Sequence, residues 1–166
     1  MYEIGEYVVH PGQGVCRVED VTDGPNPCYQ LMPVGERHPM RISYPVSSES
    51  RLRPVLSAEE ARAIIDEYPT MEVESYSEHS GTLEEQHFKD EIRRGSCQDS
   101  VRIVKTFRER IDEVKARNKK PPVAFDRILK LATARSLQEL SVALDTTPED
   151  VQALFQGALD AAEEEN

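Results

Sequence analysis

Near the N-terminus the chain reads GEYVVHPGQGVCRVEDV over residues 5–21. The β-branched pair Val8 and Val9 is followed by the turn sequence Pro-Gly-Gln-Gly. From Val15 to Val21 successive residues alternate between two faces, as in a strand. Proline donates no ladder hydrogen bond, and glycine can take the positive φ of a sharp reversal. This stretch therefore predicts a strand, a tight turn and a second strand, with His10 as a turn residue rather than a catalytic base or a ligand.

Short strands separated by turn clusters continue to residue 55. We expect three of them, over residues 28–34, 40–44 and 51–55. Five short strands joined by tight turns are typical of a small SH3-like or Tudor-like β-barrel. Alternation within the fourth strand predicts two faces. The core face carries Met40, Ile42 and Tyr44, and the face toward solvent or a partner carries Arg41 and Ser43.

The second half of the chain has the apolar spacing of helices. Two of the expected helix starts, at Ser57 and Thr82, have a Glu three residues later, as in a capping box. All expected starts are Ser57, Thr82, Ser96 or Asp99, a position near Val123, and Thr147. The predicted fold class is α+β, with a β-barrel domain over residues 1–68, a linker over 69–81 and an all-α helical domain over 82–166.

Composition excludes several classes of function. No run approaches the roughly eighteen apolar residues of a membrane span, and the N-terminus lacks the apolar core of a signal peptide, so we expect a cytoplasmic protein. The three cysteines are odd in number and lack CxxC spacing, which argues against a disulfide framework and a zinc site. No HExxH motif, phosphate-binding glycine loop or nucleophile motif is present. We therefore expect no metal, no cofactor and no enzymatic activity.

The net charge of −11 is unevenly distributed along the chain. Residues 1–88 carry 6 Lys and Arg against 16 Asp and Glu, residues 89–135 carry 14 against 7, and residues 136–166 carry none against 8. The basic middle segment is a candidate phosphate-facing surface, and its acidic flanks would restrict how a polyanion approaches. The alternative is a solvated helix face whose charges pair between residues four apart. Charge alone favours this second interpretation.

Three stretches carry a resemblance to a known family. They are residues 4–15 (IGEYVVHPGQGV), the strand 40–46 that ends in Tyr-Pro-Val, and residues 51–57 (RLRPVLS). Together they resemble the CarD/CdnL family of bacterial transcription regulators. The first stretch also resembles the RNA polymerase-interacting module of transcription-repair coupling factors. The resemblance to CarD covers nearly the whole chain, because a helical domain follows the barrel in that family too.

The resemblance implies a regulator that is not an enzyme. In the family, the barrel docks on the β subunit of RNA polymerase, largely through a sheet edge. The corresponding residues here are Met40, Arg41, Ile42, Ser43 and Tyr44. An exposed strand edge offers unpaired backbone groups to a partner strand. We expect a monomer that acts without a membrane or a cofactor, and specificity for promoters would come from the polymerase.

The resemblance also implies that the helical domain touches promoter DNA at the upstream edge of the transcription bubble and modulates the stability of the open complex. Basic residues would contact phosphates weakly, without reading the sequence. The residues expected to contact DNA are Leu83, His87, Phe88, Lys89, Arg93, Arg94 and Arg127. Family members often place a Trp near the position of Glu84, and this chain contains none, so Leu83, His87 or Phe88 would substitute for it.

Two alternatives remain. Residues 136–159 could form a DNA-binding helix-turn-helix, since Ser136 and Glu139 suggest a capping box. Its recognition helix would, however, present Glu149 and Asp150 to the major groove, where cations and amides are favoured. The second alternative is a polymerase- or protein-binding adaptor without direct DNA contact. The acidic balance of the chain and the missing Trp are consistent with such an adaptor.

Overall fold

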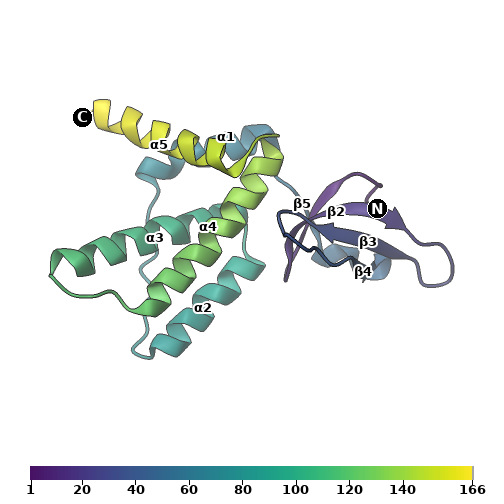
Figure 1. Cartoon of the computed structure of the whole chain (residues 1–166), viewed down its shortest axis with the longest axis horizontal. Coiled ribbons are helices and arrows are strands. Elements are labelled where there is room, and N and C mark those ends of the chain that lie inside the picture. Colours follow the sequence, from purple (N-terminus) through teal and green to yellow (C-terminus); the bar gives the residue numbers. More distant parts are fainter. Residues whose placement is uncertain (166) are drawn as a thin grey trace. The chain divides into compact units, whose positions relative to one another are not determined.

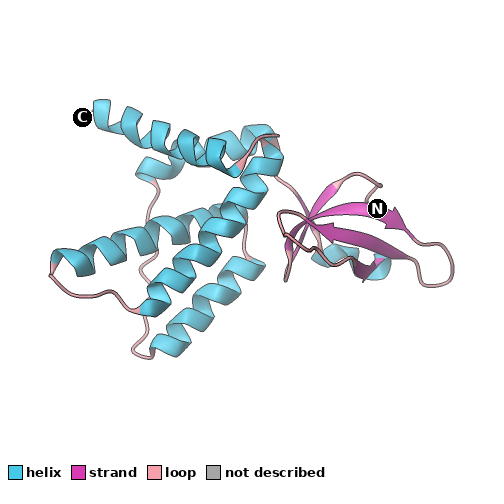
Figure 2. Cartoon of the chain, viewed as in Figure 1, coloured by secondary structure: helices cyan, strands magenta, loops and turns pink. Residues whose placement is uncertain are grey.

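The computed structural model describes residues 1–165 and consists of two compact units, Met1–Leu56 and Ser57–Asn166. Strands and one short 3-10 helix make up the first unit, and helices make up the second (Figures 1 and 2). The last strand ends at Pro54 and the first α-helix begins at Ala58, so the change from strand to helix coincides with the boundary between the units. The predicted α+β class is confirmed.

The first unit is built on one antiparallel sheet of five strands. In chain order the strands are β1 (Tyr7–His10), β2 (Gly14–Val21), β3 (Cys28–Pro33), β4 (Ile42–Pro45) and β5 (Arg53–Pro54). The fifth is short because the 3-10 helix η1 (Val46–Arg51) occupies the residues before it. The order in the sheet is β4-β3-β2-β1-β5, which makes β4 and β5 its edges. Closure of this sheet into an SH3-like or Tudor-like barrel stays a prediction.

The fourth strand starts later than the sequence pattern predicts. β4 begins at Ile42, which leaves Met40 and Arg41 in the preceding loop. The register pairs Ile42 with Leu31, so the next hydrogen-bonded pair along the ladder would join Met40 to Pro33. Because proline has no N–H to donate, the ladder stops before that pair.

The first hairpin forms as the sequence predicts. β1 and β2 meet at the pair His10 and Gly14, and Gly14 has a positive φ of 80°, which a residue with a Cβ rarely adopts. The Nδ1 atom of His10 accepts hydrogen bonds from the backbone N–H groups of Gly12 (3.0 Å) and Gln13 (3.1 Å). His10 therefore closes this turn, and its predicted role as a turn residue is confirmed.

The core of the first unit gathers alternate residues of its central strands. Its buried members are Val8, Cys16, Val18, Tyr29, Leu31 and Leu52. Tyr29 is fully buried, and its hydroxyl donates a hydrogen bond to the Glu49 carboxylate and accepts one from the Tyr2 N–H at 2.9 Å. The buried hydroxyl is thus satisfied on both sides, as burial of a polar group requires.

The second unit contains five α-helices and one 3-10 helix within the described residues. They are α1 (Ala58–Glu67), η2 (Tyr68–Thr70), α2 (Gly81–Arg94), α3 (Cys97–Ala116), α4 (Val123–Ala143) and α5 (Pro148–Glu164). Short connections reverse the chain between α2 and α3 and again between α3 and α4, so α2 and α4 run in roughly the same direction (Figure 1). Phe88 of α2 and Phe107 of α3 are fully buried between these helices, with ring centroids 4.9 Å apart.

Helix starts follow their N-caps, with one difference from the sequence-based expectation. The predicted starts at Ser57 and Thr147 are confirmed, and of the two predicted alternatives Ser96 and Asp99 the structure has Ser96. The N-cap of α2 is Ser80, whose Oγ accepts a hydrogen bond from the Leu83 N–H at 3.3 Å, so the predicted N-cap Thr82 lies inside the first turn. Glu85 does not close a capping box with Thr82, because its carboxylate binds two cations instead.

The segment expected to be a linker packs along α3. Two cations of α3, Lys105 and Arg110, donate hydrogen bonds to four of its carbonyl groups. These belong to Pro69 (3.0 Å), Met71 (2.6 Å), Glu74 (3.2 Å) and Tyr76 (2.6 Å). We call residues 69–80 the strap. The strap and α1 both group with the helical unit, so the division of the structure differs from the expected domains at 1–68 and 82–166.

Candidate functional sites

The edge strand β4 holds three of the residues expected to bind the polymerase. Ile42 and Tyr44 are half-buried and pack against the core of the first unit, as predicted. Arg41 and Ser43 are exposed. Met40 is 79% exposed in the loop before β4, so the prediction that it faces the core is wrong, because the strand does not extend to it.

The backbone of Ser43 faces away from the sheet. The Val46 N–H donates a hydrogen bond to the Pro27 carbonyl at 3.0 Å, and β4 pairs with β3 without a register shift. Because hydrogen-bonded and non-bonded pairs alternate along an antiparallel ladder, the N–H and C=O of Ser43 point to the open side. Pro45 is the next outward residue and has no N–H. The free edge is therefore short and centred on Ser43.

A second candidate lies at one end of the helical unit, which we call the helix-end surface. The N-termini of α2 and α4 share this end with the loop 117–122 that follows α3 (Figure 1). In the first turns of these helices, Leu83 is 58% exposed and Val123 is 63% exposed. Lys119 and Lys120 are exposed in the loop. Two helix N-termini and two lysines favour an anion, while the two apolar side chains offer a surface for packing.

Glu85 binds two of the cations that were expected to contact DNA. Its carboxylate accepts hydrogen bonds from Arg127 of α4 at 2.7, 3.0 and 3.2 Å and lies 3.2 Å from the Lys89 Nζ atom. Hydrogen bonding by Arg127 lowers the pKa of Glu85, so this carboxyl is ionised at neutral pH. The Glu85 side chain is only 12% exposed, whereas that of Arg127 is 55% exposed. The carboxylate thus lies beneath the cations and neutralises part of their charge.

The remaining predicted DNA contacts do not join this end of the unit. Phe88 is fully buried, so its expected contact with DNA is corrected: the helical core covers the ring. His87 stacks on Tyr76 of the strap with ring centroids 3.7 Å apart. Arg93 and Arg94 are exposed at the C-terminal end of α2, roughly 20 Å along the helix from its start. The structure divides the predicted set between the two ends of α2.

At least six of the 14 cations of the basic segment form ion pairs inside the unit. The ion pairs are Lys89 and Arg127 with Glu85, Arg102 with Asp99, Arg110 with Glu84, Arg117 with Glu113, and Lys130 with Asp126. Several join residues three or four apart, as the solvated-face interpretation predicted. Within residues 1–165, the cations of this segment without a hydrogen bond or ion pair are Arg93, Arg94, Lys115, Lys119 and Lys120.

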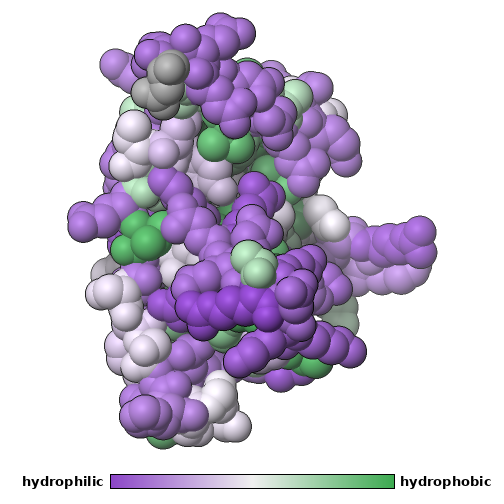
Figure 3. All heavy atoms as spheres, turned by 90° about the vertical axis from the view of Figure 1, so that its left-hand side faces the viewer, coloured by the Kyte–Doolittle hydropathy of each residue, from purple (hydrophilic) through white to green (hydrophobic). Residues whose placement is uncertain are grey.

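Sequence reasoning missed Lys119, Lys120 and Val123 as members of a candidate site. The signal was the helix break Asn-Lys-Lys-Pro-Pro, which places two lysines beside the start of α4. On the face drawn in Figure 3, hydrophilic residues cover most of the surface and hydrophobic residues form small separate patches. Such a surface suits a polar or charged partner better than a broad apolar one.

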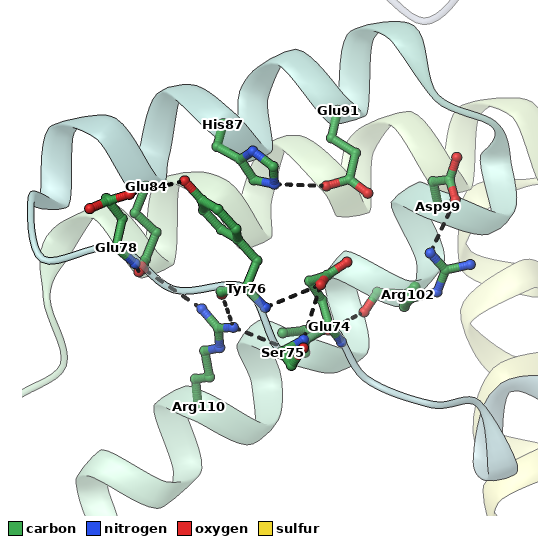
Figure 4. A network of polar contacts seen from close by, with 11 residues as sticks. Glu74, Ser75, Tyr76, Glu78, Glu84, His87, Glu91, Asp99, Arg102 and Arg110 are labelled. Atoms are coloured by element: carbon green, nitrogen blue, oxygen red, sulfur yellow. Dashed lines mark hydrogen bonds and ion pairs between the residues drawn. The ribbon is translucent and has the colours of Figure 1, made fainter.

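A polar network fastens the strap to α2 and α3 (Figure 4). Arg110, which binds two strap carbonyls, also lies 3.7 Å from the carboxylate of Glu84. Glu84 is 8% exposed and accepts a hydrogen bond from the Glu78 N–H at 3.0 Å. Burial raises the pKa of Glu91, whose Oε2 lies 3.4 Å from the His87 Nε2 without forming a hydrogen bond. These contacts give the network a structural role.

Residues 136–159 do not form the expected pair of short helices. Ser136 lies inside α4, where its hydroxyl donates a hydrogen bond to the Ala132 carbonyl at 2.7 Å instead of capping a new helix. Glu149 and Asp150 occupy the exposed first turn of α5 and would repel phosphates. The structure therefore does not support the helix-turn-helix interpretation.

Residues 1–165 contain neither a metal-binding cluster of side chains nor a helix that could span a membrane. No group of three or more His, Cys, Asp or Glu side chains in this part of the chain is arranged to hold a metal ion. None of its helices combines the length and the apolar character needed to cross a membrane. None of Cys16, Cys28 and Cys97 forms a disulfide.

Comparison with protein families assigns the first unit. Residues 2–56 match the model of the CarD-like/TRCF RID domain, and the match spans all five strands. The first unit belongs to this family. The predicted resemblance to CarD-like proteins is confirmed for this part of the chain, which is an RNA polymerase-interacting domain of a transcription-related, regulatory family. A comparison with curated proteins found no match.

The RID domain contains the open edge of β4, and its match ends at the boundary between the two units. The exposed residues Ser43 and Arg41 lie within the residues that match this domain. The helical unit, with its helix-end surface, lies outside the matched residues.

Proposed function

We propose that the chain is a transcription regulator with two contacts. The RID domain binds the β subunit of RNA polymerase through β4, and the helix-end surface touches promoter DNA without reading its sequence. Together they change the stability of the open promoter complex. The observation that carries the proposal is the open β4 edge, centred on Ser43, within a domain of the CarD-like/TRCF RID family.

The polymerase contact would form by strand addition. A strand of the partner can bind the outward N–H and C=O of Ser43, and main-chain hydrogen bonds of this kind give affinity without requiring a particular sequence. Arg41 and Met40 are exposed beside the edge and would add charge and apolar contact. Ile42 and Tyr44 pack on the core and would position the strand rather than touch the partner.

A pair of substitutions at one position tests this contact. Ser43→Pro removes the outward N–H, and a proline is tolerated there because that N–H makes no bond to β3. We expect at least roughly a tenfold loss of affinity for the isolated β subunit, since a backbone hydrogen bond and a close approach are both lost. The matched control Ser43→Ala removes the side chain but keeps the N–H, and it should bind as the parent does. If Ser43→Pro binds the β subunit as tightly as Ser43→Ala does, β4 does not form the interface.

The DNA contact would depend on the helix-end surface. Lys119 and Lys120 can reach phosphates beside the N-termini of α2 and α4, and Arg127 has donors that Glu85 does not use. Leu83 and Val123 would pack against a sugar or a base edge, in place of the Trp of other family members. With a net charge of −11, the chain alone should bind DNA weakly. Binding to the polymerase would raise the effective concentration of DNA to about the millimolar range.

Two variants with the same charge change separate the ends of α2. The double variant Lys119→Glu, Lys120→Glu should bind polymerase as the parent does but should change the open-complex lifetime less. Arg93→Glu with Arg94→Glu, at the other end of α2, should retain the parent's effect on that lifetime. The reverse result would move the DNA contact to the C-terminal end of α2. If neither double variant changes the lifetime, the chain is an adaptor that binds polymerase without gripping DNA.

A further inference from the structure

The helices α3, α4 and α5 and the 3-10 helix η2 line a partly open hollow of about 160 Å³ in the helical unit. Its apolar walls come from Val101, Val104, Leu137, Phe155 and Leu159. Thr133, Ser136, Gln152 and Gln156 add polar groups to the lining. An engineered cavity of about 150 Å³ is large enough to bind benzene. The hollow therefore has the volume for one six-membered ring, which its apolar side chains can contact.

One cation lies at this hollow. Arg108 is the single charged residue among its lining residues, and no acidic side chain joins it. The Arg108 side chain is exposed, and its one hydrogen bond within residues 1–165 is a long one, from Nη1 to the Tyr68 hydroxyl at 3.4 Å. Most of the guanidinium donors are thus available to a ligand that enters the hollow.

The aromatic residues at the hollow suit a flat ligand. Tyr68 and Phe155 meet edge to face with ring centroids 5.1 Å apart, and both line the hollow. Phe155 and Leu159 come from α5, where Val151 is the only fully buried residue among those described. Because α5 is held by few buried side chains, this wall can shift to admit a ligand.

We propose that the hollow binds a small aromatic monocarboxylate of about the size of benzoate. The ring would fill the space beside Val104 and Phe155, and the carboxylate would form a bidentate pair with Arg108. This pairing is strong because the planar guanidinium matches both carboxylate oxygens. A neutral hydrocarbon would offer Arg108 no acceptor, and a doubly charged anion would meet only one cation. The site is separate from β4 and from the helix-end surface.

The test is a titration of the full chain with benzoate, followed by amide NMR shifts. Ligands with so few atoms bind in about the millimolar range, so the titration extends to about 10 mM. We expect saturable shifts of residues around the hollow, including Val104 and Phe155. Benzyl alcohol, which has the ring without the charge, should bind at least roughly tenfold more weakly, since a hydrogen bond to a charged group is lost.

Two variants keep the result interpretable. Arg108→Gln should weaken benzoate binding roughly tenfold and abolish the preference over benzyl alcohol. Arg117→Gln is the matched control, because Arg117 is on the same helix, pairs with Glu113 and does not line the hollow. Equal benzoate binding by the parent and Arg108→Gln, equal binding of the two ligands, or shifts that stay linear or lie elsewhere would each overturn the proposal.

Discussion

Replacing Arg110 by Met tests whether one side chain fastens the strap. The substitution keeps an unbranched apolar stem and removes hydrogen bonds of 3.2 and 2.6 Å to the Glu74 and Tyr76 carbonyls. It also leaves Glu84 without its ion pair, in a place where the two side chains are 20% and 11% exposed. Breaking a buried pair costs about 3–5 kcal/mol. Because this pair is long and partly exposed, we expect a loss of about 3 kcal/mol in the free energy of unfolding of the helical unit.

The assay is urea unfolding of the full chain followed by its helical circular dichroism, since the chain has no Trp to report by fluorescence. The control Arg117→Met breaks an ion pair whose side chains are 63% and 64% exposed, and it should cost about 0.5 kcal/mol or less. Arg110→Met should also make residues 69–80 cleavable by protease under conditions in which the parent resists. An unfolding free energy equal to that of Arg117→Met, with an uncut strap, would refute the fastening role.

Three further predictions concern other contacts. Burial, and then hydrogen bonding to Glu49, raises the pKa of Tyr29. Above about pH 10 the unfolded state therefore binds fewer protons than the folded state, and the first unit should lose stability as pH rises. Tyr29→Phe should flatten this pH dependence of the free energy of unfolding in urea. His10→Phe keeps a ring beside Tyr44 but removes the acceptor of two turn N–H groups, and it should cost about 1 kcal/mol by the same measurement. Glu85→Gln should tighten non-specific binding to duplex DNA, measured by fluorescence anisotropy, because Lys89 and Arg127 lose their carboxylate partner. The salt dependence of binding should steepen by about the amount expected for one more phosphate contact. The control Glu163→Gln in α5 should have a smaller effect.

Local signals predicted the elements of this fold well. The hairpin around His10 and the capping box at Ser57 depend on residues close in sequence, and both formed as predicted. The start of α2 did not, because Ser80 and Thr82 are both competent N-caps. The choice between them is linked to Glu84, which is buried against Arg110 of another helix, and no local pattern shows that contact.

The candidate sites were harder to predict because they depend on distant residues. Arg127 was expected to be free for phosphate, yet it binds Glu85, which is 42 positions away in the sequence. Phe88 has the position and the ring of a candidate wedge, but the packing of α2, α3 and α4 buries it. Lys119 and Lys120 became candidates only when the parallel arrangement of α2 and α4 placed their loop beside two helix N-termini.

The fastened strap shortens the tether between the RID domain and the helical unit. A free segment over residues 69–81 could extend by up to about 45 Å, whereas the residues between β5 and α1 span at most about 14 Å. The volume open to a flexibly tethered body grows as about the 3/2 power of the tether length, so the shorter connection shrinks that volume roughly sixfold. With the RID domain held on a partner, the local concentration of the helical unit would rise by a similar factor. A surface with few unpaired cations could then act on DNA at a strength that its own affinity would not reach.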